Sequence, residues 1–241
     1  MSFWEHLEEL RRVLLRCLAI VSLFAILAFV FKDEVFFVVF APKSPDFLPG
    51  LFGSSPDIQL INTELTRQFV LHMMTSFYVG IIVAAPYILY ELYRFVSPAL
   101  YENERRYSTP LVVASYLMFM AGILFSYFIV FPITFRFLGN YQVSGAVENL
   151  ISLESYIDTL VFLSLAMGLV FEIPIFSWLL GRLGILWREQ MRAFRRHALV
   201  AILMVAAIIT PTSDAFTLAI VSLPMYLLYE LSILLVPGRE R

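Results

Sequence analysis

The stretch that decides the fold runs from Tyr107 to Phe135 and reads YSTPLVVASYLMFMAGILFSYFIVFPITF. It contains no Asp, Glu, Lys or Arg. At about 1.5 Å per residue, a helix of this length covers roughly 40 Å, which exceeds the hydrocarbon core of about 30 Å. The stretch therefore predicts a helix that crosses a lipid bilayer.

Further charge-free runs lie on both sides of this stretch. They are Cys17–Phe31, Gln68–Tyr90, Thr159–Phe171, Ile173–Gly181, Ala198–Ser213 and Ala215–Tyr229. Because Glu172 alone separates the third from the fourth, we join those two into one span. The expected fold class is an all-α polytopic membrane protein with six transmembrane helices, over about 12–31, 68–93, 108–131, 156–181, 197–211 and 215–235. The last two runs hold only 16 and 15 residues, so we expect the last two helices to be short.

The composition of the whole chain agrees with this fold class. Of its 241 residues, 60% are hydrophobic and 15% are charged, whereas a soluble domain is nearer half apolar and a quarter charged. A soluble domain and a disordered chain are both excluded, since disorder requires the opposite bias. The net charge of −2 gives no general attraction to nucleic acid, so we expect membrane lipid and no nucleic acid as partners.

The Lys and Arg residues are distributed unequally between the two sides of the membrane. Thirteen lie on one side, namely Arg11, Arg12, Arg16, Arg94, Arg105, Arg106, Arg182, Arg188, Arg192, Arg195, Arg196, Arg239 and Arg241. Four lie on the other, namely Lys32, Lys43, Arg67 and Arg136. Because loops rich in Lys and Arg stay in the cytoplasm, this distribution predicts that both termini are cytoplasmic.

The whole chain, 1–241, is expected to form a single integral membrane domain. Residues 32–67 carry four prolines and are long for a plain connector, so they predict an ordered external cap. Residues 132–155 are expected to form a second external loop. The last external turn is short, and Asp214 within it is a candidate cap for the final helix.

Glu172 is the one carboxylate expected near the bilayer midplane. It lies ten residues before Arg182, or roughly 15 Å along a helix. Pro174 has no N–H and so frees the carbonyl of Val170. An intramembrane carboxylate is a candidate functional site, here for a partner helix or for a proton. The alternatives are an acid satisfied inside the bundle and the proton relay of a small proton-coupled solute transporter.

Acidic residues also gather on the predicted cytoplasmic side. Glu8 and Glu9 precede the first span, and Glu102 and Glu104 lie in the first cytoplasmic loop. Together they could form a carboxylate cluster that pairs bidentately with guanidinium groups, so a ligand with two arginines would fit. The alternative is an interfacial helix with a solvated charged face that leads into the first span.

Enzymatic and metal chemistry have little support in the sequence. No Gly-x-Ser-x-Gly, His-Glu-x-x-His or phosphate-loop motif is present. His72 and Ser76 share a helix face, but nothing marks an oxyanion site beside them. Cys17 is the only cysteine, which excludes an internal disulfide and a thiolate metal cluster. We expect no catalytic residue, no metal and no cofactor.

Several motifs together resemble the TatC family, the core subunit of the twin-arginine protein translocase. They are His6-Leu7-x-Glu9-Leu10-Arg11, Ala41-Pro42, Ala85-Pro86-Tyr87-Ile88-Leu89-Tyr90, Phe95-x-x-Pro98-Ala99-Leu100-Tyr101-x-x-Glu104-Arg105-Arg106, Phe171-Glu172-x-Pro174, Thr210-Pro211 with Asp214, and Pro224-Met225-Tyr226. The resemblance runs over nearly the whole chain, and the motif that begins at Phe95 is the most specific.

The resemblance implies a function in protein export across the cytoplasmic (inner) membrane. Proteins of this family bind twin-arginine signal peptides of folded precursor proteins, assemble with the single-span subunits TatA and TatB in a hetero-oligomer, and use the proton-motive force. The residues that match the signal-binding surface are Glu8, Glu9, Arg11, Phe95, Glu104 and Arg105. Those that match the intramembrane docking site are Phe171, Glu172 and Pro174, and those that match the family's outer turns are Pro42 and Asp214.

Two positions depart from the family's usual pattern. Val13 stands where a further basic residue is usual, and Leu218 stands where many members place Gln.

Overall fold

The computed structural model describes residues 3–44, 47, 59–96, 108–141, 150–210 and 214–238. Its helices are α1 (Phe3–Val30), α2 (Lys32–Phe40), η1 (Ala41–Lys43), α3 (Arg67–Val96), α4 (Ser108–Phe125), η4 (Ser126–Val130), α5 (Phe131–Asn140), α6 (Leu153–Phe171), α7 (Ile173–Arg182), α8 (Arg188–Ala193), α9 (Arg195–Ile209) and α10 (Ala215–Leu235). Two short strands, β1 (Leu60–Ile61) and β2 (Ile151–Ser152), pair in parallel. The chain divides into two compact units, one built from 1–47, 57–116 and 150–157, the other from the remainder.

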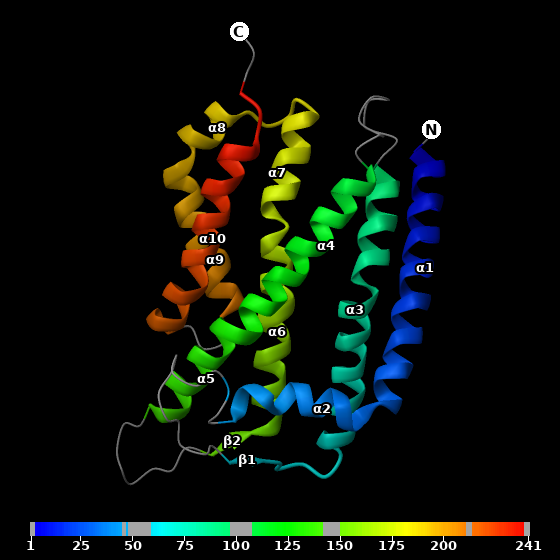
Figure 1. Cartoon of the computed structure of the whole chain (residues 1–241), viewed down its shortest axis with the longest axis vertical. Coiled ribbons are helices and arrows are strands. Elements are labelled where there is room, and N and C mark those ends of the chain that lie inside the picture. The colour runs from blue at the N-terminus through cyan, green and yellow to red at the C-terminus, as the bar shows by residue number, and fades with distance from the viewer. Residues whose placement is uncertain are drawn as a thin grey trace. The chain divides into compact units, whose positions relative to one another are not determined.

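In the first unit, α1 and α3 pack side by side and run in opposite directions (Figure 1). Gly80 lies at a close approach of their backbones. A Cβ atom at this position would lie 2.8 Å from both the Ala25 nitrogen and the Val21 oxygen, so only glycine fits without a shift of the backbone. The result is a tight antiparallel helix pair.

The predicted outer end of the first unit is formed by α2, η1 and the strand pair. Tyr156 at the start of α6 is fully buried, and its hydroxyl donates to the Val39 carbonyl at 2.9 Å. Carbonyls in the last turn of a helix have no partner within the helix, so this hydrogen bond satisfies one of them in α2. An ion pair between Arg67 and Glu154 joins the start of α3 to α6.

In the second unit, helical structure continues well beyond the expected end of the third span. The helix predicted to end near residue 131 passes through η4, a π-helical segment, and then α5 extends to Asn140. The helix therefore ends at Asn140 rather than near residue 131, and residues 132–140 of the expected external loop are helical. The physical reason is that the π-helical segment η4 directly precedes Pro132. Its wider turn, in which the Phe131 N–H donates to the Ser126 carbonyl, lets the helix continue past a residue that has no N–H.

The fourth predicted span forms as two helices, α6 and α7, that meet at Glu172. The Glu172 N–H donates to the Leu169 carbonyl at 3.1 Å, a tighter i→i+3 turn than in an α-helix. Pro174 opens α7 and cannot donate a hydrogen bond. A polar side chain and an interrupted backbone therefore coincide within one span.

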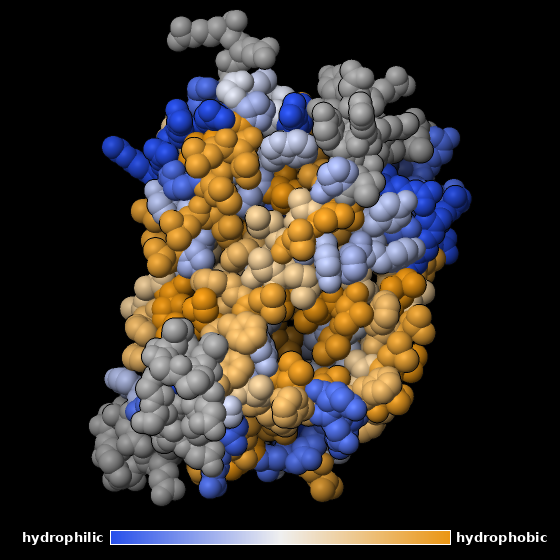
Figure 2. Space-filling model, viewed as in Figure 1, coloured by the Kyte–Doolittle hydropathy of each residue, from blue (hydrophilic) through white to orange (hydrophobic). Residues whose placement is uncertain are grey.

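Five helical segments are long and apolar enough to cross a membrane among the described residues. They are Trp4–Val30, Arg67–Phe95, Pro110–Asn140, Leu153–Arg182 and Ala215–Leu235. Of the last two helices, α9 is the shorter: it holds 15 residues, or roughly 22 Å. α10 holds 21 residues, because the helix continues past Glu230, where the charge-free run of the sequence ends. In Figure 2, hydrophilic residues gather at the first turns of α1 and hydrophobic residues cover the rest of that helix, as a membrane-spanning segment requires.

Candidate functional site

The acidic segment before the first predicted span is helical. It forms the first turns of α1, which runs without a break from Phe3 to Val30. Arg12 is held by two acids on this segment. Its Nη2 atom donates to Glu8 Oε1 at 2.6 Å, and its Nη1 atom lies 3.8 Å from Glu9 Oε2. Arg11 is exposed. Glu8 and Glu9 therefore share a single arginine of the same helix.

The His6 ring connects this segment to the end of α3. It stacks on Phe95 with 4.3 Å between the ring centroids and 23° between the planes. The structure thus brings Phe95, a predicted site residue, beside the helix that carries Glu8 and Glu9. Glu104 and Arg105, the other two residues predicted for this site, lie outside the described residues.

Val13 is buried, although the resemblance places a basic residue here. It lies one turn after Glu9 on α1, on the side packed against α3. An apolar side chain suits this position because the position is shielded from water.

Glu91 is a buried acid that sequence reasoning missed. Its position near the end of the second span suggested access to water, yet the residue is only 3% exposed. Its Oε1 atom accepts a hydrogen bond from the Tyr87 hydroxyl at 3.0 Å, and its Oε2 atom lies 3.4 Å from Arg16 Nη1. The spacing of Tyr87 and Glu91 on one helix face was the available signal.

The intramembrane site lies in the second unit. Glu172 is 3% exposed, Pro174 is also buried, and Phe171 packs against Phe125 with ring centroids 5.7 Å apart. The three predicted docking residues are therefore together at the junction of α6 and α7. An acid here is enclosed by protein and adjoins backbone that does not form regular helical hydrogen bonds.

The two predicted turn residues both have structural roles. Pro42 is buried in η1, directly after α2. Asp214 caps α10, because its Oδ1 atom accepts a hydrogen bond from the Thr217 N–H at 2.7 Å. The expectation that Asp214 caps the final helix is confirmed.

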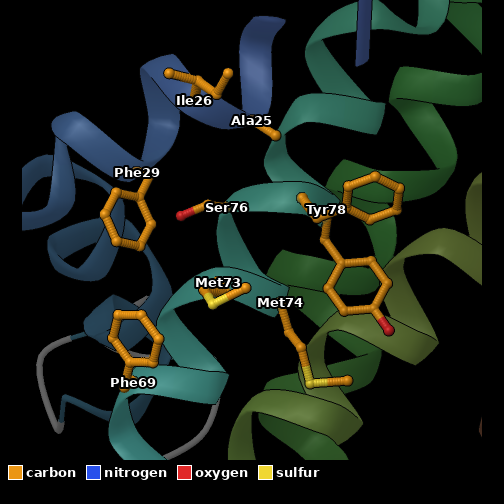
Figure 3. Close-up of a pocket in the computed structure, with 9 residues that line it drawn as sticks. Ala25, Ile26, Phe29, Phe69, Met73, Met74, Ser76 and Tyr78 are labelled. Carbon is orange, nitrogen blue, oxygen red and sulfur yellow. The ribbon is translucent and has the colours of Figure 1, made fainter. Parts of the chain in front are cut away.

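A groove of about 550 Å³ lies between the C-terminal part of α1 and the N-terminal half of α3 (Figure 3). Phenylalanine and methionine side chains form most of its lining. Ser76 lines it too, but its hydroxyl donates to the His72 carbonyl within α3 at 2.8 Å. The His72 ring is stacked on the Phe29 ring, with 4.0 Å between the ring centroids. Ser76 and His72 therefore do not form a nucleophile–base pair, and the groove is an apolar surface.

Among the described residues, no three His, Cys, Asp or Glu side chains converge as a metal site. The fold and these sites define a class: a helical, multi-pass membrane protein with acids at one end of a helix pair and one acid within a span. The family model described as Sec-independent protein translocase protein (TatC) matches residues 5–224. The chain therefore belongs to the TatC family and is a protein translocase component, not an enzyme.

Similar proteins agree with this assignment over nearly the full chain. A TatC from Escherichia coli K12 is 37% identical over 229 residues, which cover 95% of this chain and 85% of that protein. A TatC from Deinococcus radiodurans is 34% identical, with coverage of 96% and 84%. A crystal structure of the twin-arginine translocase receptor TatC matches with a TM-score of 0.80 and 35% identity, over 95% of this chain and 97% of that one.

Proposed function

We propose that this chain binds twin-arginine signal peptides of folded precursor proteins at the surface formed by the first turns of α1 and the end of α3. The observation that carries the proposal is the stacking of His6 on Phe95 at 4.3 Å. It brings the helix that carries Glu8 and Glu9 against Phe95, which precedes Glu104 by nine residues in the sequence. Carboxylates from two segments could then bind the two guanidinium groups of one peptide.

The chemistry of the acids supports an arginine ligand. Among the residues that the structure describes, Glu8 and Glu9 share Arg12, so a second guanidinium can bind without displacing it. Guanidinium is planar and pairs with a carboxylate through two parallel hydrogen bonds, which the ammonium group of lysine cannot do. A surface of this kind discriminates between arginine and lysine peptides.

We further propose that both termini face the cytoplasm, that the chain resides in the inner membrane, and that it assembles with TatA and TatB for export driven by the proton-motive force. Thirteen basic residues on one side against four on the other support the orientation. Phe171, Glu172 and Pro174 are the proposed docking site for the partner helices. A buried acid beside an interrupted helix suits a polar group on a single-span partner.

Peptide binding to the purified full chain in lipid nanodiscs tests the recognition proposal. We expect a twin-arginine peptide to bind, its Lys-Lys form to bind much more weakly, and Glu9→Lys to abolish binding. Glu64→Lys makes the same charge change on an exposed residue outside the site and serves as the control. Equal affinity for the two peptides, or undiminished binding by Glu9→Lys, would contradict the proposal.

A further inference from the structure

One six-residue sequence occurs twice in the chain with nearly the same residues. Residues 87–92 read YILYEL and residues 226–231 read YLLYEL. The first copy lies near the end of α3, and the second lies near the end of α10. Each copy places a tyrosine four residues before a glutamate, so both side chains share one helix face.

The two copies make the same set of contacts in their own units. In the first, the Tyr87 hydroxyl donates to Glu91 at 3.0 Å, and Arg16 of the antiparallel helix α1 lies 3.4 Å from the same carboxylate. In the second, the Tyr226 hydroxyl donates to Glu230 at 3.1 Å, and Arg195 of α9 contacts that carboxylate at 2.6 Å. We call each Tyr–Glu–Arg set a clasp.

The two clasps differ in how far the acid is removed from water. The Glu91 side chain is 3% exposed, whereas that of Glu230 is 29% exposed. A solvated ion pair contributes little, because water and salt compete with it. A buried carboxylate that loses its partner is left uncompensated, so the first clasp strongly favours the arrangement in which α1 lies on α3.

The first clasp lies beneath the proposed recognition surface. Glu9, Val13 and Arg16 recur at helical spacing on α1, and Arg16 is about 10 Å along the helix from Glu9. On α3, Glu91 is one turn before Phe95. A contact between Arg16 and Glu91 therefore fixes the register of the two helices just below the His6–Phe95 stack.

We propose that Tyr87, Glu91 and Arg16 are positioning residues for signal-peptide recognition. The clasp holds the first turns of α1 against the end of α3, so that Glu8 and Glu9 face the ligand from a fixed position. This inference rests on the proposed function, whose site it supports without touching the peptide.

A double-mutant cycle on the full chain in nanodiscs tests the clasp, with a twin-arginine peptide as the probe. We expect Glu91→Gln and Arg16→Gln each to weaken binding about tenfold, and the double variant to weaken it about tenfold rather than a hundredfold, since both changes break one contact. Glu230→Gln, the same change in the second clasp, is the matched control and should alter the affinity by less than about twofold.

A distance measurement separates positioning from a general loss of stability. Leu7 and Leu92 are exposed on α1 and α3, so spin labels there report how the two helices sit at this end. We expect a narrow distance distribution that broadens in Glu91→Gln while the unfolding temperature changes little. Tyr87→Phe removes one hydroxyl only and repeats the test should Glu91→Gln not fold.

Three results would overturn the clasp: independent, multiplicative losses in the cycle, an unchanged distance distribution in Glu91→Gln, or an equal loss of affinity in Glu230→Gln. Failure of the unmodified chain to bind the peptide would instead overturn the proposed function. In that case the distance measurement alone decides whether the clasp orders α1.

Discussion

Tyr156 shows how one side chain can order the predicted outer end of the first unit. It is 1% exposed, and its hydroxyl satisfies the Val39 carbonyl across 117 residues of sequence. Tyr156→Phe keeps the ring but leaves this carbonyl without that partner. We expect the free energy of unfolding to fall by about 1–2 kcal/mol.

Chemical unfolding in detergent micelles measures this loss. Tyr90→Phe, which removes the hydroxyl of an exposed tyrosine on α3, is the matched control and should change stability by less than about 0.5 kcal/mol. Equal stabilities of the two variants would show that the Tyr156 hydrogen bond contributes nothing measurable.

Glu172 is the second residue whose role can be isolated. Glu172→Ala removes the carboxyl group from the docking site while the α6–α7 junction keeps Pro174. We expect co-purification of the partner subunits to fall severalfold and the affinity for a twin-arginine peptide to stay unchanged, because recognition is proposed to reside on α1 and α3. Intact assembly and transport in this variant would make Glu172 a satisfied core acid.

At the scale of elements, the α1–α3 pair depends on the absence of a side chain at Gly80. Gly80→Ala places a methyl group 2.8 Å from backbone atoms of Val21 and Ala25, and backbone cannot move aside as a flexible side chain can. We expect a loss of about 1–3 kcal/mol in stability and a wider separation of the helices. Ala19→Val adds bulk on the exposed face of α1 and is the control. Equal losses of stability in Gly80→Ala and Ala19→Val, measured by unfolding, would contradict close packing at Gly80.

The elements also show what the sequence could and could not predict. Local rules sufficed for α10, where the Asp214 cap and the span 215–235 agree with the structure, because a cap depends only on neighbouring residues. The buried state of Glu91 was missed because the helical period shows which residues share a face of α3, but not which face α1 covers. Helix continuation through η4 was missed for a related reason: proline disrupts a regular α-helix, and the π-helical turn that accommodates Pro132 is not visible in the sequence.

In the candidate site, too, the sequence indicated single residues but not the contacts between helices. The resemblance selected Glu9, Phe95 and Glu172, and composition selected Glu172 independently as an exception among apolar residues. The pairing of His6 with Phe95 joins positions 89 residues apart, and no local pattern indicates it. Contacts between helices therefore required the structure, whereas the candidate acids did not.

For the whole molecule, the length of α9 determines how the protein fits a bilayer. Its 15 residues cover roughly 22 Å, against a hydrocarbon core of about 30 Å, while α10 beside it is long enough to span. A short span is accommodated by local thinning of the bilayer or by snorkelling of charged residues at its end, such as Arg196 in the first turn of α9. Thinning at this place would lower the barrier to a translocated protein.

An insertion of about four apolar residues after Leu203 lengthens α9 by one turn and distinguishes these possibilities. If α9 thins the bilayer, the unmodified chain should be most stable in lipids with shorter acyl chains, and the insertion should shift the optimum to longer ones and reduce transport. The same insertion after Val83 in α3, already 30 residues long, would disturb packing without this shift and is the control. If snorkelling compensates, both chains should share one lipid optimum, because the flanking side chains already reach the interface and the bilayer keeps its thickness.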